Sequence, residues 1–486
     1  MVFYSLQYFL FLPLVFLVYH YCGDRQRRLV LLLASFCFYA AFKLPYLLGA
    51  LALVTSITYA AGLGMGADAT PRRRKVFFLL AICGDLMVLV AIKYLPFIEK
   101  SFNDLASGLS WGVSLPVTPL LVTIGVSYYV FQALSYLIDI YLEIQEPERD
   151  FICFALYLSF FPKLLQGPIE RAGDLLPQLR APSAFNYENV RAGLLLFTWG
   201  MFKKLVIADR LGLFVDLVYG DPHAYSGGAC LFATYIYAFQ LYFDFSGYTD
   251  MALGTARLFN INLTQNFNSP YLARSVADFW RRWHISFSRW LLDYLFKPLQ
   301  MHFRNWRDLG VALALLITFF ISGVWHGASW GFIVWGALHG LYLATSVFYK
   351  PLQKRIYKLT GLQGSLSQKI WQTVFTFNLV CLAWIFFRAE SLTDAWYIIT
   401  HMFNAARDTL LNGNLSDLVA LGKGKNRFLQ SLLPLAIPLI VSLAKGRVDI
   451  FTRPRWFRWG VYYLLVYIIL YHSVINAKSQ FVYFRF

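Results

Sequence analysis

Charged residues are scarce in this 486-residue sequence: they make up 14% of it, whereas about 25% is usual in soluble domains. Acidic residues are the scarcer sign, with 26 Asp and Glu against 43 Lys and Arg, and the net charge is +17. Hydrophobic residues reach 58%, and apolar stretches recur from end to end without a long polar break. These proportions exclude a soluble or disordered chain and indicate an integral membrane protein.

Several chemical signatures are also missing. The six cysteines are scattered and form no Cys-x-x-Cys pair, which argues against a disulfide framework or a structural zinc site. The sequence has no Walker A loop, no H-E-x-x-H zinc motif and no H-x4-D motif. We therefore expect no metal and no cofactor. Cytoplasmic loops account for the basic excess better than nucleic acid does, and part of that charge can attract an anionic substrate.

Apolar stretches that approach the roughly 20 residues needed to span a bilayer run along most of the chain. They predict an all-α protein of about 11–13 helices in a single membrane-embedded unit, residues 1–486. The expected spans are 3–21, 29–42, 45–64, 76–97, 119–141, 190–216, 228–243, 309–326, 329–348, 371–387, 428–444 and 459–475. The shorter stretch 151–166 is a re-entrant candidate, and 275–300, which mixes Trp and Arg, is expected at the interface.

Loop charge predicts the orientation. The basic loops at 25–28 and 72–75 are separated by two spans, as are those at 350–369 and 445–458, so all four can be cytoplasmic. The tail, residues 476–486, then lies on the outer face. The first stretch lacks a basic n-region and a cleavage site, and we expect it to be a retained membrane helix.

Ionisable groups in apolar spans are costly, so each is a functional candidate. His326 lies between Gly323 and Gly327 and between Trp325 and Trp330. Flanking glycines let a backbone or a substrate approach the imidazole, which is suited to proton transfer near neutral pH. The alternative is a core histidine hydrogen-bonded to a neighbouring helix.

A second candidate is the Trp- and Arg-rich segment around His284, in which Arg281 and Arg282 can hold an anion. Such residues are also ordinary membrane anchors. Asp244 and Asp250 would lie about 240° apart on a continuous helix, and Gly247 between them suggests a break instead. A structural role for Asp244 is as plausible as a functional one. His339 lies about 220° from His326 on such a helix, which disfavours a shared metal or haem.

The last residues, Phe481-Val-Tyr-Phe-Arg-Phe486, form an aromatic tail that anchors at the interface or inserts into a cavity. A transporter that uses His326 and buried acids as an ion path is the alternative of another class. It predicts inverted repeats, and we find none. A haem-bearing electron carrier would need histidines that face each other across helices.

With these residues identified, the chain resembles the membrane-bound O-acyltransferase family, on its bacterial branch of alginate and other envelope-polysaccharide O-acetyltransferases. The resemblance rests on Phe279-Trp-Arg-Arg-Trp-His-Ile-Ser286, Trp325-His-Gly-Ala-Ser-Trp330 and Gln166-Gly-Pro-Ile-Glu-Arg171, and further on residues 124–132, 244–252, 322–340 and 386–390. It implies a ring of tilted helices around a thinned, tunnelled centre, with a catalytic core at about 115–345 and C-terminal helices and tail at 371–486. Residues 289–308 depart from the family's pattern because they lack a Gly-Gly-Asn-Arg loop. The acceptor, alginate or another glycan, is therefore left open.

The resemblance also implies roles and partners in a bacterial inner membrane. His326 matches the family's essential intramembrane histidine, and His284 matches a second histidine on the donor side. Tyr483 fits the Phe-x-Tyr-x-x-Phe spacing of a suspected acyl acceptor in relatives that modify envelope polymers.

Further binding residues follow from the expected chemistry. We expect Arg281 and Arg282 to bind the phosphates of acetyl-CoA as donor substrate, and Trp325, Trp330 and Asp244 to contact the substrates. The expected partners are membrane lipid, a polysaccharide acceptor and an extracytoplasmic acetyltransferase. The nearest alternative is D-alanyl transfer from an acyl carrier protein to teichoic acid or acyl transfer to peptidoglycan.

Overall fold

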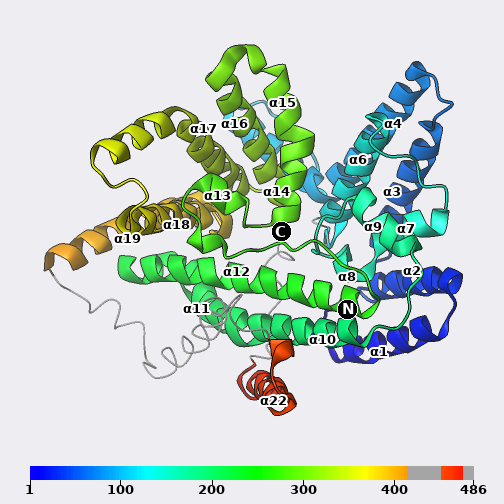
Figure 1. Cartoon of the computed structure of the whole chain (residues 1–486). Helices are drawn as coiled ribbons and strands as arrows, with labels where there is room; N and C mark the ends of the chain where they lie inside the picture. The colour runs from blue at the N-terminus through cyan, green and yellow to red at the C-terminus, as the bar shows by residue number, and fades with distance from the viewer. Residues whose placement is uncertain (120, 413–449, 474–486) are drawn as a thin grey trace. The chain divides into compact units, whose positions relative to one another are not determined.

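The computed structural model describes residues 1–119, 121–412 and 450–473, and all regular structure within these ranges is helical (Figure 1). This confirms the all-α prediction for the described part of the chain. The expected span 428–444 and the candidate Tyr483 lie outside the described residues.

Within the described ranges, five helical segments are long and apolar enough to cross a membrane, as the sequence predicts for a multi-pass membrane protein. They are Pro45–Gly64 (α3), Pro71–Gly108 (α4 with α5), Arg304–His326 (ending in α16), Trp330–Leu359 (α17) and Leu366–Arg388 (α18). Four of them contain a predicted span, and α17 begins one residue after the start of the predicted span 329–348. Other expected spans are shorter or interrupted: 190–216 divides into α10 (Tyr187–Met201), a π-helical turn at Phe202–Ala208 and α11 (Asp209–Gly220).

The described residues fall into two compact units. The first contains residues 1–197 and 249–265, and the second contains 198–248 together with 266–412 and 450–473. Helix α12 (Gly227–Leu258) contributes its first part to the second unit and its last part to the first. That the whole chain acts as one membrane domain remains a prediction.

Helices α3, α4 (Pro71–Leu89) and α6 (Val126–Tyr141) pack against one another in the first unit (Figure 1). Small residues allow this approach: a Cβ atom added to Gly62 of α3 would lie 3.1 Å from the Tyr136 ring of α6. Helix α6 is buried along almost its whole length, as expected for a central helix of a bundle.

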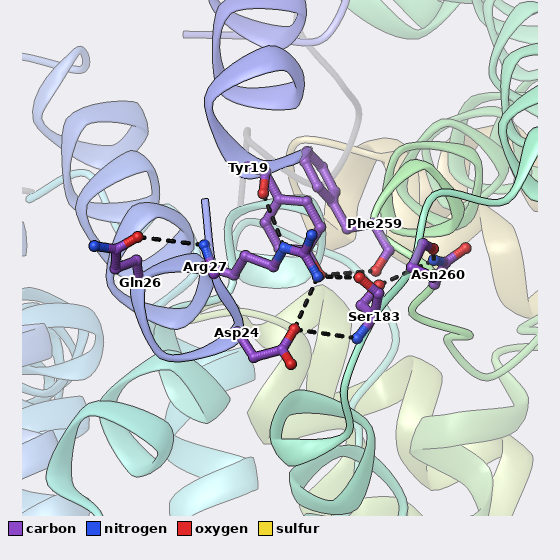
Figure 2. A network of polar contacts seen from close by, with 9 residues as sticks. Tyr19, Asp24, Gln26, Arg27, Ser183, Phe259 and Asn260 are labelled. Carbon is purple, nitrogen blue, oxygen red and sulfur yellow. Dashed lines mark hydrogen bonds and ion pairs between the residues drawn. The ribbon is translucent and has the colours of Figure 1, made fainter. Parts of the chain in front are cut away.

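A polar network holds the turn between α1 (Leu6–Tyr21) and α2 (Asp24–Ala40) against two other segments of the first unit (Figure 2). Arg27 donates from Nε to the carbonyl of Tyr19 at 3.0 Å and pairs with Asp24 at 2.8 Å. It also donates to the carbonyl of Ser183, whose hydroxyl accepts a 2.9 Å hydrogen bond from Asn260. One arginine of a predicted cytoplasmic loop is therefore used to fix the fold.

The re-entrant candidate 151–166 forms two short helices, α7 (Phe151–Ser159) and α8 (Phe161–Leu164). Lys163 on α8 is fully buried and donates to Oε1 of Gln132 on α6. Tyr157 on α7 donates to the carbonyls of Gln132 and Glu170 at 3.2 and 3.1 Å. These hydrogen bonds satisfy polar groups whose burial without a partner would cost free energy.

The predicted break at Gly247 is wrong, because α12 continues through it to Leu258. A Cβ atom at Gly247 would lie 2.9 Å from the carbonyl oxygen of Gly200 and 3.1 Å from the backbone nitrogen of Lys204. The glycine is therefore needed for close packing within the second unit. This packing outweighs the cost of about 1 kcal/mol that glycine has in a helix relative to alanine.

Candidate active site

The predicted interfacial segment folds into short helices of the second unit: α13 (Val276–Trp280), α14 (Ile285–Leu291), the π-helical turn Leu292–Phe296 and α15 (Lys297–His302). His284 occupies the N-cap of α14 with φ of 43°, a left-handed conformation that non-glycine residues seldom adopt. Asn266 holds this corner, since its backbone carbonyl accepts from Ile285 N at 3.0 Å and its Oδ1 accepts from Ser286 N at 3.1 Å. A strained backbone fixed in this way is typical of functional positions.

The imidazole of His284 is fully buried among aromatic rings. Phe245 of α12 meets it edge-on with centroids 4.8 Å apart, and Phe287 lies at 5.1 Å, one turn further along α14. Trp325 reaches it from α16 at 6.3 Å.

His326 is the last residue of α16 (Arg307–His326), where the chain turns into α17. The two helices pack so closely that a Cβ at Gly323 would lie 2.4 Å from the carbonyl oxygen of Phe332, and one at Gly336 would lie 2.4 Å from that of Phe319. The space left by Gly323 is thus filled by the backbone of α17, one of the two outcomes that the sequence allows.

In the part of the chain that the structure describes, four aromatic rings contact the imidazole of His326, which is 4% exposed. Trp335 lies perpendicular to it at 4.7 Å, Trp325 at 4.9 Å, Phe387 at 5.4 Å and Phe287 at 5.5 Å. The structure therefore places both predicted histidines in contact with one residue, Phe287. Water is largely excluded from this cluster, which strengthens any electrostatic interaction made in it.

The predicted substrate-binding residues differ in their placement. Trp325 is buried and stacks on Phe287 at 4.3 Å. Its indole also contacts both histidines. Trp330, in contrast, is 54% exposed at the first position of α17. Arg281 is exposed, whereas Arg282 is half-buried and bonded from Nε to Asp278 at 3.0 Å.

Asp244 belongs to a buried ion cluster. Its Oδ1 lies 2.6 Å from Nζ of Lys204, which also contacts Oδ1 of Asp209 at 2.9 Å. All three side chains are nearly inaccessible to solvent. These buried ion pairs favour the structural alternative for Asp244.

Residues that the sequence did not single out complete the cluster, chiefly Phe287, Trp335 and Phe387. Aromatic residues make up 19% of the chain, and only their helical spacing from His284 and His326 could have marked these three. The described residues hold no group of three or more His, Cys, Asp or Glu placed to bind a metal ion.

One further pattern lies beside His326. Residues 327–331 read Gly-Ala-Ser-Trp-Gly, the letters of the G-x-S-x-G nucleophile elbow. That motif needs a strand before its serine and a helix after it. Here helix α16 precedes it, and Ser329 is the extended N-cap residue of α17. The match is therefore to a helix start and not to an esterase elbow.

Known proteins share these segments. Residues 142–393 match the model of MBOAT, the membrane-bound O-acyltransferase family. The chain is 38% identical over 419 residues to the probable alginate O-acetylase AlgI of Azotobacter vinelandii, covering 85% of this chain and 80% of that protein. It is 34% identical over 427 residues to a peptidoglycan O-acetyltransferase of Helicobacter pylori, covering 81% and 78%. It is 29% identical over 286 residues to a teichoic acid D-alanyltransferase of Bacillus subtilis, covering 57% and 71%.

Proposed function

This chain belongs to the membrane-bound O-acyltransferase family, and on that premise we propose that it moves an acetyl group from a cytoplasmic thioester to an extracytoplasmic polysaccharide. Because the family consists of acyltransferases, the chain is an enzyme, and the transporter alternative is set aside. The observation that carries the proposal is the meeting of His284 and His326 at Phe287 in one buried aromatic cluster.

In the proposed reaction His326 acts as general base. Its imidazole accepts the proton of the acceptor hydroxyl, whose oxygen attacks the thioester carbonyl carbon. The C–S bond then breaks, and the leaving thiolate takes up the proton that His326 accepted. An apolar surrounding favours the neutral imidazole, the form that accepts a proton. His284, on the donor side, orients the thioester, and its fixed left-handed backbone supports that role.

The donor we propose is acetyl-CoA, with its phosphates held by Arg281 and Arg282. Arg281 is the more available of the two, because it is exposed and Arg282 already bonds to Asp278. Trp325, which touches both histidines, is the better candidate of the two indoles for contact with the reacting acyl group. Trp330 is a weaker candidate because it is exposed.

For the acceptor, we propose an envelope polysaccharide reached through a covalent relay, since such polymers are too bulky for a buried site. Tyr483 would receive the acetyl group as a phenyl ester, and a partner acetyltransferase outside the membrane would pass it to the glycan. The relatives named for alginate and peptidoglycan acetylation support a glycan acceptor without choosing between the two.

A second candidate is D-alanyl transfer from an acyl carrier protein. Similarity to a teichoic acid D-alanyltransferase favours it, although over a smaller share of the chain. Purified protein incubated with either radiolabelled acetyl-CoA or a radiolabelled D-alanyl carrier protein separates the two. Hydroxylamine-labile label from acetyl-CoA alone, lost in Tyr483→Phe, supports the full proposal. Label only from the carrier protein overturns the acetyl donor, and label that persists in Tyr483→Phe overturns the relay.

A further inference from the structure

A third buried histidine lies close to the candidate site. His339 of α17 is fully inaccessible to solvent, and Nε1 of Trp280 lies 3.2 Å from its Nδ1. An indole nitrogen can only donate, so Trp280 is the donor and Nδ1 is the acceptor. The neutral ring therefore carries its proton on Nε2, and this hydrogen bond fixes the tautomer.

This hydrogen bond joins the segment that carries His284 to α17, the helix that follows His326. Trp280 is the last residue of α13, one turn before His284. His339 lies one turn after Trp335 on α17, the helix that packs along α16 up to His326.

The rings continue the connection to His326. His339 and Trp335 have centroids 5.1 Å apart with planes at 67°, and Trp335 meets His326 at 4.7 Å and 89°. Trp384 of α18 also stacks on Trp335, at 5.6 Å and 15°, so this indole has little freedom to turn. His339 and His326 therefore both contact the same indole ring, that of Trp335.

We propose that His339 is a positioning residue of the acyl-transfer site: by accepting the Trp280 hydrogen bond it holds the His284 segment in register with Trp335, and Trp335 holds His326. The inference rests on the proposed function for its consequence in catalysis. It does not make His339 a ligand of the substrate.

Four variants test it. Trp280→Phe and His339→Leu each remove one side of the hydrogen bond and keep most of the side-chain volume. His339→Asn keeps an acceptor at the same number of bonds from the backbone. Tyr342→Phe is the matched control, because Tyr342 contacts the His339 ring at 5.8 Å without belonging to the connection to His326.

The first readout does not need activity. Nitrogen-15 spectra of the full-length, histidine-labelled protein in nanodiscs report each imidazole, and the His326 and His339 signals are assigned by their loss in His326→Gln and His339→Asn. We expect a bare Nδ1 on His339, and a shift of the His326 signals in Trp280→Phe and His339→Leu but not in His339→Asn or Tyr342→Phe. A protonated Nδ1 on His339, or His326 signals unchanged by Trp280→Phe and His339→Leu, would overturn the proposal.

The second readout is acetyl transfer from acetyl-CoA by the same proteins. Misplacing a catalytic group by about 1 Å costs about a hundredfold, so we expect His339→Leu and Trp280→Phe to lower kcat by about 10- to 100-fold with KM for the donor little changed. His339→Asn should recover to within about fivefold of wild type. Equal losses in His339→Leu and His339→Asn contradict positioning through the acceptor. Retained activity in His326→Ala would instead refute the proposed function, while the spectra still decide the role of His339.

Discussion

Phe287 and Trp325 stack with their ring centroids 4.3 Å apart and their planes at 27°, and each ring contacts both His284 and His326. The pair joins α14 to the end of α16. It therefore links the two imidazoles through ring contacts.

Removing one ring of this pair should damage activity more than stability. Phe287→Leu keeps apolar volume but loses the flat surface between the histidines, so we expect kcat to fall at least about tenfold. Phe154→Leu, at a fully buried ring of α7 in the other unit, is the control for general packing loss. Acetyl transfer and thermal unfolding of both variants provide the comparison, and equal effects on activity would count against a special role for Phe287.

Close packing of α16 on α17 should be sensitive to one methyl group. Gly336→Ala places a Cβ 2.4 Å from the Phe319 carbonyl oxygen, and we expect a loss of about 1–3 kcal/mol in the free energy of unfolding. Gly49→Ala on α3 meets no atom within 4 Å and should be neutral or gain up to about 1 kcal/mol. Thermal unfolding in detergent tests this order, and a Gly336→Ala protein as stable as wild type would contradict the observed packing.

Removing the cation from the buried ion cluster should destabilise the protein more than removing one carboxylate. Lys204→Met removes the ammonium group that contacts both Asp244 and Asp209, and we expect a loss of about 3–5 kcal/mol in the free energy of unfolding. Asp244→Asn leaves Lys204 paired with Asp209 and should cost less. The unfolding midpoints of the two variants test this order of destabilisation, and an equal or larger loss in Asp244→Asn would contradict it. If Asp244→Asn folds normally yet loses binding of a substrate, Asp244 has the binding role that the sequence also allowed.

Asp278 gives a pH-dependent expectation. Burial alone would raise its pKa, but the hydrogen bonds from Arg282 and from the backbone N–H of Arg274 outweigh it and lower the pKa of this carboxyl. A lowered folded-state pKa stabilises the fold at pH above the ordinary value of about 3.9. That contribution is lost as the pH falls from there through the lowered pKa. The stability difference between wild type and Asp278→Asn should be constant near neutral pH and shrink in acid, and a difference that grows in acid would reverse the assignment.

Part of this organisation could be predicted from the sequence. The span at 45–64 coincides with α3, and 309–326 ends with α16 at His326, because long apolar runs have few alternatives in a membrane. The predicted break at Gly247 is wrong because close packing at this position outweighs the low helix propensity of glycine. The hydrogen bond between Trp280 and His339 could not be predicted either, since no local pattern shows which of many aromatic residues meet across helices.

The central claim is that His326 takes the proton of the attacking hydroxyl, and the most direct test is the rate of acetyl transfer by His326→Gln and His326→Ala in proteoliposomes. Both proteins should unfold at nearly the wild-type temperature. Because a general base contributes about 100- to 10,000-fold, we predict a loss in that range for both variants, with donor binding retained. Transfer by His326→Gln within about tenfold of wild type would contradict the account, because glutamine fills the site but cannot serve as a general base.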